Sequence, residues 1–173
     1  MSASLHATHV PGFIAMLTNI KAWLDVAAAT GNEAELIDAR LTDDMFPLAR
    51  QIQIASDAAK GAGARMTGSE APAMADTETS FAELKTRCDK TIAYLQQVDP
   101  AAFDAGAGRE VVITFPNGGG VKFDGQTFLT QFAVPNFYFH ASMTYAILRA
   151  NGIGIGKQNY LGHLAPYMFA PPA

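Results

Sequence analysis

The chain has 173 residues, of which 49% are hydrophobic and 16% are charged, so it can bury a sizeable core and disorder is not expected. Its net charge of -4 and its scattered Lys and Arg residues argue against a nucleic-acid-binding protein, because phosphate binding needs a concentrated basic face. One cysteine allows no internal disulfide. No signal peptide is visible, and no stretch approaches the roughly 18 to 20 apolar residues of a membrane span. We therefore expect a soluble, cytoplasmic protein that forms one domain over residues 1–173.

Two amphipathic helices are predicted in the first third of the chain. Apolar residues recur at spacings of three and four over residues 13–28, and Gly31 is a typical helix stop. A polar connection with one short helical turn follows. The second helix is predicted to begin near Asp43 or Asp44, whose charges suit the positive end of its dipole, with Pro47 tolerated in the first turn.

A third helix is predicted from Ser80 to just before Pro100. Ser80 and Glu83 have the spacing of a capping box, in which each side chain bonds the other residue's backbone N–H. Residues 99–108, "DPAAFDAGAG", are expected to form a loop.

The hydrophobic period then changes from helical to two. "EVVITF" and "VKF" alternate on either side of "PNGGG", which predicts a small β-hairpin. A fourth helix is expected over residues 126–151, with Gly152 as its stop. Residues 153–173 are irregular and rich in Gly, Pro and aromatics. The part from Tyr160 to Phe169 is apolar enough that we expect it to pack on the bundle or on a partner subunit.

Four long amphipathic helices around one core predict an all-α protein. An antiparallel four-helix bundle, with the hairpin inserted before the last long helix, is the simplest arrangement. The long second and third connections leave room for a crossover.

The fourth helix carries the most informative polar residues. Asn136 and His140 lie one turn apart on its apolar face, just after Pro135, whose ring is expected to kink the helix and free the carbonyl of Gln131. His140 is interpreted either as a buried histidine, hydrogen bonded to Asn136 or to another helix, or as a metal ligand, since bundle cores hold metal sites between facing helices.

Other candidate groups are less specific. His6 and His9 are spaced to bind a metal at the bundle end or to form a solvated helix start, and His163 lies in the tail. Cys88 falls on the apolar stripe of the third helix, where a thiol is expected to be inert. Asp57 is the acidic residue of the second helix placed to approach a core site.

Three segments resemble a bacterial family of unknown function within the DinB/YfiT-like superfamily. They are "LTDDMFPLARQIQIASDAAKGAGARM", "DTETSFAELKTRCDKTIAYL" and "PNFYFHASMTYAILRANGIGIGKQNYLG". The resemblance covers nearly the whole chain and implies a four-helix bundle with unusual helix order, usually a homodimer.

The resemblance also implies a site. Better-known members of the superfamily hold a divalent metal with one histidine from the second helix and an H-x-x-x-H pair on the last helix. Counting back from "ILRANG" puts His140 on the second histidine of that pair and Asn136 on the first. The second helix offers Gln51 or Gln53, of which Gln53 is preferred. Amides are weak ligands for zinc or nickel, so a tightly bound metal is not expected.

These observations leave three hypotheses. The first is a non-metal bundle that binds a small molecule around His140, with Asn136, Gln53 or Asp57 as polar contacts. The second is a divalent-metal-dependent enzyme, of hydrolase or thiol transferase type, that recruits His6, His9 or His163. The third is a structural homodimer without a catalytic site.

Overall fold

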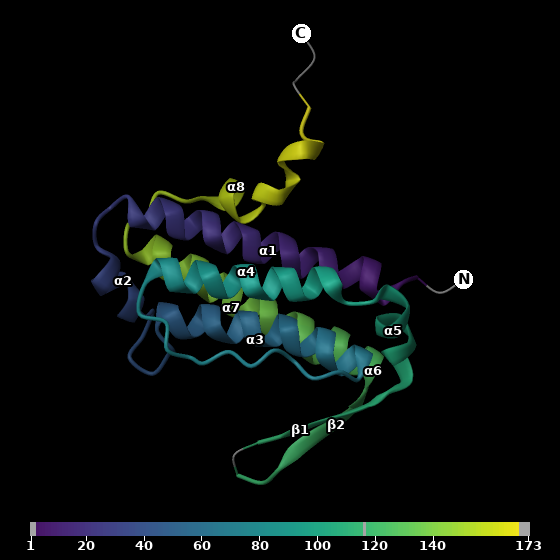
Figure 1. Ribbon diagram of the computed structural model, residues 1–173. Helices are drawn as coiled ribbons and strands as arrows, with labels where there is room; N and C mark the ends of the chain where they lie inside the picture. The colour runs from purple at the N-terminus through teal and green to yellow at the C-terminus, as the bar shows by residue number, and fades with distance from the viewer. Residues whose placement is uncertain (1–2, 116, 170–173) are drawn as a thin grey trace.

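Four long helices form the bundle in the computed structural model, which describes residues 3–115 and 117–169 (Figure 1). They are α1 (Leu5–Ala28), α3 (Leu48–Thr67), α4 (Phe81–Gln97) and α7 (Val134–Ala150). α1 packs against α4 and α7, and α3 packs against the same two helices. The order around the bundle is therefore α1, α4, α3, α7, which confirms the predicted bundle and its unusual helix order.

The helix directions differ from a simple antiparallel bundle. In Figure 1, α3 and α4 run in the same direction, opposite to α1 and α7. The chain must therefore return along the whole bundle between α3 and α4. Residues 68–80 make this return without regular secondary structure, and we call them the return segment. It is the crossover for which the long connection left room.

The helix starts follow local capping chemistry. The Ser4 hydroxyl accepts a hydrogen bond from the Ala7 N–H at 3.0 Å, so α1 begins earlier than the apolar stripe indicated. The Ser80–Glu83 capping box of α4 is confirmed. The predicted start of α3 near residue 43 is wrong, because Pro47 is the extended N-cap residue and a proline also holds the residue before it out of the helical region.

Short elements complete the connections. The predicted helical turn after α1 is α2 (Glu33–Asp38). The loop expected at residues 99–108 is instead α5 (Pro100–Ala105) followed by the 3-10 turn η1 (Gly106–Gly108). The helix forms there because the Asp99 carboxylate caps the Ala102 N–H at 2.7 Å and a proline is well suited to the first helical position.

The predicted hairpin is confirmed. β1 (Glu110–Thr114) and β2 (Gly120–Asp124) pair antiparallel. The hairpin joins the bundle where backbones come very close, since a Cβ on Gly106 would lie 1.9 Å from the Met66 carbonyl oxygen. Only glycine fits this junction.

The expected kink at Pro135 takes the form of a π-helical segment. After α6 (Gly125–Thr127), the segment η2 (Phe128–Ala133) has i-to-i−5 bonds, ending with the Val134 N–H on the Leu129 carbonyl. A proline ring clashes with the carbonyl four residues earlier in an α-helix, and the wider π turn relieves that clash. α7 continues from there to Ala150.

The C-terminal part first packs on the bundle, where Ile153 and Ile155 are buried, and then projects from it. Gly152 has a φ of 79°, as a helix stop requires, and the chain then forms α8 (Lys157–Tyr160) and the 3-10 segment η3 (Gly162–Tyr167). Within residues 3–115 and 117–169, no helix combines the length and apolarity needed to cross a membrane.

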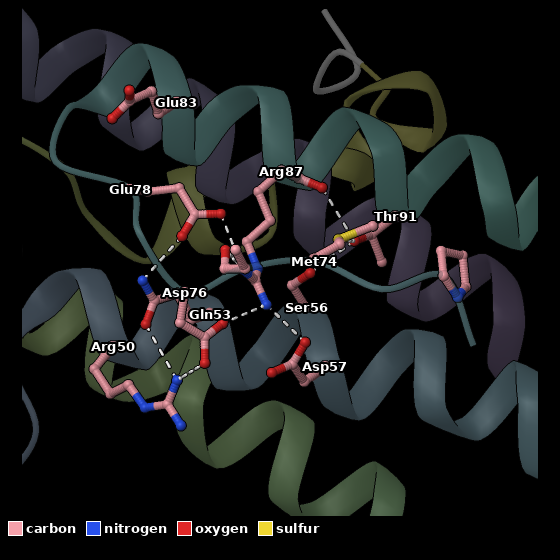
Figure 2. A network of polar contacts seen from close by, with 12 residues as sticks. Arg50, Gln53, Ser56, Asp57, Met74, Asp76, Glu78, Glu83, Arg87 and Thr91 are labelled. Carbon is pink, nitrogen blue, oxygen red and sulfur yellow. Dashed lines mark hydrogen bonds and ion pairs between the residues drawn. The ribbon is translucent and has the colours of Figure 1, made fainter. Parts of the chain in front are cut away.

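A buried guanidinium fixes the return segment. Figure 2 shows Arg87 reaching from α4 toward Asp57 of α3 and Glu78 of the return segment. Its side chain is 1% exposed, with Nη2 at 2.7 Å from Asp57 and 3.0 Å from Asp76, and Nη1 at 2.9 Å from Glu78 and 3.1 Å from the Ala75 carbonyl oxygen. One cation therefore joins α4, α3 and the return segment. We call these residues the Arg87 cluster.

Neighbouring contacts extend the cluster along α3. Lys60 Nζ donates to the Pro72 carbonyl and pairs with Asp57, each at 3.0 Å, and Arg50 pairs with Asp76. Each cation of this region thus faces a carboxylate, which compensates for the desolvation of the charges.

We expect Arg87→Met to lower the free energy of unfolding by about 3 kcal/mol, because it leaves three converging carboxylates without their shared cation. Urea unfolding at neutral pH measures this loss. The matched control is Lys85→Met, which removes only the exposed Lys85–Asp25 pair and should cost less than about 1 kcal/mol. Equal losses in the two variants would contradict the role given to Arg87.

Candidate functional site

His140 hydrogen bonds to α3. Its Nδ1 lies 2.7 Å from Oε1 of Gln51, and the residue is 7% exposed. Of the interpretations left open by the sequence, a buried histidine bonded to another helix is the one observed. The preference for Gln53 as the α3 partner of His140 is wrong.

The Gln51 amide fixes the tautomer of His140. Gln51 Nε2 donates to the Phe46 carbonyl at 3.0 Å, so the Gln51 oxygen faces the imidazole and must accept from Nδ1–H. Nε2 of His140 then carries the lone pair. Burial lowers the pKa of His140 to about 4, and the positive charge of Arg50 adds to the effect. His140 is therefore a neutral hydrogen-bond acceptor at physiological pH.

Asn136 and Asp57 line one small cavity of about 170 Å³ beside α3 and η2. Its other lining residues are mostly apolar or aromatic: Ile54, Ala58, Arg65, Ile113, Phe128, Phe132 and Ala133. The Arg65 side chain donates to the Gly61 carbonyl at 3.3 Å and lies over the Phe128 ring. Two of the residues singled out from the sequence thus share a mixed polar and apolar cavity.

The Asp57 carboxylate serves two neighbours. Its Oδ1 accepts from Arg87 at 2.7 Å and contacts Lys60 at 3.0 Å, and its side chain is 37% exposed. Within the described part of the chain, no hydrogen bond reaches Oδ2 of Asp57 or the side-chain amide of Asn136. The cavity therefore offers one oriented carboxylate oxygen and one amide with both a donor and an acceptor.

Gln53 does not join this cavity. Its Nε2 donates to Glu78 at 3.0 Å and its Oε1 accepts from Arg50 at 3.2 Å, which places it in the Arg87 cluster (Figure 2). Residues two apart on a helix point in nearly opposite directions, so Gln51 and Gln53 cannot both face α7.

The remaining histidines lie elsewhere. The His6 ring packs edge-on against Phe103 of α5, and His163 Nδ1 lies 3.1 Å from the Asn19 amide. In the described ranges, no three His, Cys, Asp or Glu residues come together in a way that would hold a metal ion. The hypothesis that His6, His9 or His163 completes a site at His140 therefore finds no matching geometry.

The donor set at His140 does not fit a tightly held transition metal. Such sites take at least three protein ligands, usually imidazole, thiolate or carboxylate. Here His140 offers one imidazole nitrogen, while the Gln51 oxygen already accepts the Nδ1 proton. Cys88 is no substitute, because burial raises the pKa of its thiol to about 12, with a further contribution from Asp89.

Of the residues in the Arg87 cluster, the sequence singled out Asp57 and Gln53 but not Arg87, Asp76 or Glu78. Arg87 looked like one of several basic residues around Cys88, and Asp76 and Glu78 lay in a segment without periodicity. The available signal was position: Arg87 falls three residues after Leu84 and four before Thr91, both fully buried on α4. A cation at such a spacing predicts a buried ion pair.

The fold and helix order define a four-helix bundle of the DinB type. The chain is similar in structure to a crystal structure described as a DinB family member protein from Shewanella denitrificans, with 39% sequence identity, 96% of each chain covered and a TM-score of 0.82. Residues 5–161 match the family described as "Domain of unknown function (DUF1993)". The chain belongs to this DUF1993 family. No curated protein matches it.

We expect the His140–Gln51 pair to make stability depend on pH. The folded protein keeps His140 neutral down to pH about 4, whereas an unfolded histidine binds a proton near pH 6.5. Unfolding therefore takes up a proton between these values, and the contribution of His140 to stability falls as the pH is lowered from about 6.5 to 4, by on the order of 3 kcal/mol.

Urea unfolding of the wild type and of His140→Gln, over a series of pH values, measures this dependence. The stability difference between them should move in favour of the variant as the pH falls. If the unfolding free energies of the two proteins instead change in parallel with pH, His140 titrates alike in the folded and unfolded states.

Proposed function

We propose that this protein binds a small, mostly apolar molecule bearing a primary amide or amine in the cavity that Asp57 and Asn136 share, without a tightly held metal. The observation that carries the proposal is the presence of two polar groups with free hydrogen-bonding capacity on one apolar cavity. Binding sites generally combine apolar walls with a few convergent polar groups.

The chemistry of the two groups favours an amide. A primary amide would donate its N–H to Asp57 Oδ2 and accept from the Asn136 N–H, so both polar groups would be satisfied together. A carboxylate ligand would place its charge against Asp57 and lacks a donor. The volume of about 170 Å³ lies below the roughly 300 to 1,000 Å³ of drug-sized sites, which favours a short metabolite or side chain.

The Arg87 cluster supports the proposal by orienting Asp57. Arg87 and Lys60 hold one oxygen of the carboxylate and leave the other without a hydrogen bond from the described residues, while Asp57 lines the cavity. An oriented polar group loses little freedom when a ligand binds, so the interaction is stronger for the same contact. His140 lies one turn along α7 from Asn136 and does not line this cavity.

The probe for this proposal is isobutyramide, with isobutyrate as its charged counterpart. We expect isobutyramide to shift the side-chain amide resonances of Asn136 in NMR titrations, and isobutyrate to leave them unchanged at the same concentration. Asn136→Leu should weaken binding at least about tenfold, since it removes both hydrogen-bonding groups of the amide. The matched control is Gln131→Leu, an exposed amide in the same helical run that does not line the cavity. Equal binding of the two probes, or equal binding by the two variants, would contradict the proposal.

The alternative function, a divalent-metal-dependent enzyme of the superfamily, has a separate test. We expect elemental analysis of protein purified without an affinity tag to find far less than one zinc, nickel or iron per chain, because one imidazole and two amides bind these ions weakly. The comparison protein is His140→Ala. Stoichiometric metal in the wild type that disappears in this variant would restore the metal-dependent enzyme and overturn the proposal made here.

A further inference from the structure

The start of the C-terminal tail is held firmly on the bundle. Trp23 Nε1 of α1 donates to the Asn159 carbonyl at 3.0 Å, and the Asn19 amide donates to the Tyr160 carbonyl at 2.9 Å. The Tyr160 ring stacks on Trp23 with centroids 5.6 Å apart, and its hydroxyl lies 3.0 Å from that of Ser142 on α7. Tyr160 is therefore a fixed anchor point.

Beyond this anchor His163 still contacts Asn19 of α1, and the chain then leaves its own bundle. Figure 1 shows the segment after α8 projecting away from α1, on the side opposite the hairpin. Leu164, Tyr167, Met168 and Phe169 are 41%, 80%, 76% and 89% exposed. Of the two alternatives expected for Tyr160 to Phe169, packing on the bundle is not observed for these four residues within one chain, and packing on a partner subunit stays a prediction.

The projecting segment carries both a groove and side chains that could fill one. An apolar groove of about 550 Å³ is lined by residues of α8 and η3: Lys157, Gln158, Leu161, Gly162, Leu164, Ala165 and Met168. Tyr167 and Phe169 do not line it and are the most exposed large side chains of the described residues. One copy thus presents an apolar groove next to two aromatic side chains that face solvent.

We infer that the projecting segment, residues 161–169, is a self-association surface whose occupant is the same segment of a second copy. A two-fold interface brings the same patch of both subunits together, so each copy must supply both the groove and the side chains that fill it. Here Tyr167 and Phe169 of each copy pack on the groove of the other.

The charge pattern favours a second copy over other partners. Lys157 is the one charged residue that lines the groove, and residues 158–173 contain no Asp, Glu, Lys or Arg, so two segments approach with little like-charge repulsion. A membrane surface, in contrast, is recognised by apolar groups flanked by several basic residues, and Lys157 is the nearest one.

The surface area that these side chains can bury limits the expected affinity of the dimer. An aromatic side chain buries roughly 150 to 250 Å². Two aromatics and two aliphatic side chains per copy therefore provide about 1,000 Å² for the pair, the lower limit for a specific interface. A reversible dimer with a micromolar Kd follows, supported by the fixed anchor at Tyr160, which reduces the ordering needed on association.

Sedimentation equilibrium of the full chain over a range of micromolar concentrations tests the inference. We expect the wild type to form a dimer, and the double variant Tyr167→Ser/Phe169→Ser to dimerise at least about tenfold more weakly. Both positions are exposed, so the fold should not depend on them. The control is Val112→Ser, which removes an exposed apolar side chain of the hairpin, far from the tail, and should leave the dimer intact.

A second measurement locates the contact. Ala165→Cys places a thiol in the groove, and Phe169→Cys places one at a side chain that fills the groove of the other copy, while the native Cys88 is fully buried. Mild oxidation of a mixture of the two variants should therefore trap a disulfide-linked dimer that contains one copy of each, and should trap none of the wild type. The inference is overturned by a wild type that stays monomeric throughout, by a dimer that survives the double variant, or by a segment that instead binds neutral lipid vesicles as a monomer.

Discussion

The structure depends on the burial of one guanidinium between three carboxylates. Because α3 and α4 are parallel, the chain between them must run the full length of the bundle without a regular hydrogen-bonding pattern. Arg87 supplies what this segment lacks, binding the side chains of Asp76 and Glu78 and the Ala75 carbonyl while it pairs with Asp57 of α3. A cation paired in this way stabilises one relative arrangement of α3, α4 and the return segment. Apolar packing alone would allow several arrangements of these three elements.

Asp57 connects this constraint to the candidate site. One of its oxygens belongs to the Arg87 cluster, and the residue also lines the cavity that Asn136 lines. The position of the carboxylate is therefore set by contacts that have nothing to do with a ligand. The same logic holds at His140, where the Phe46 carbonyl orients Gln51 and Gln51 orients the imidazole. Both polar positions of the α3–α7 face are thus fixed by groups behind them, which is the arrangement that a preorganised binding site requires.

The hydrophobic period predicted the architecture well because helices and the hairpin are local structures. It placed the long helices and both strands, and the spacing of Ser80 and Glu83 predicted the cap of α4. It was wrong at the start of α3 and at α5, where a single proline decides whether a helix begins and the stripe carries no information. It also could not predict the π-helical form of the turn before Pro135, since an extra residue in one turn leaves the flanking apolar pattern almost unchanged.

The site was harder to predict because it depends on which direction a polar side chain takes from a helix. Gln51 and Gln53 are the same residue type two positions apart, yet one faces α7 and the other the return segment. Buried neighbours do not separate them: Gln51 lies three residues after Leu48 and four before Ala55, and Gln53 lies four after Ala49 and three before Ser56, all of them buried. The resemblance to metal-binding relatives indicates only the residue types to consider. Which helix each glutamine faces is set by the packing of α3 against both α4 and α7. In this chain, the amide of Gln51 bonds one buried, neutral imidazole and Asn136 lines a cavity, so the described residues do not bring together the imidazole, thiolate or carboxylate ligands that a transition metal takes.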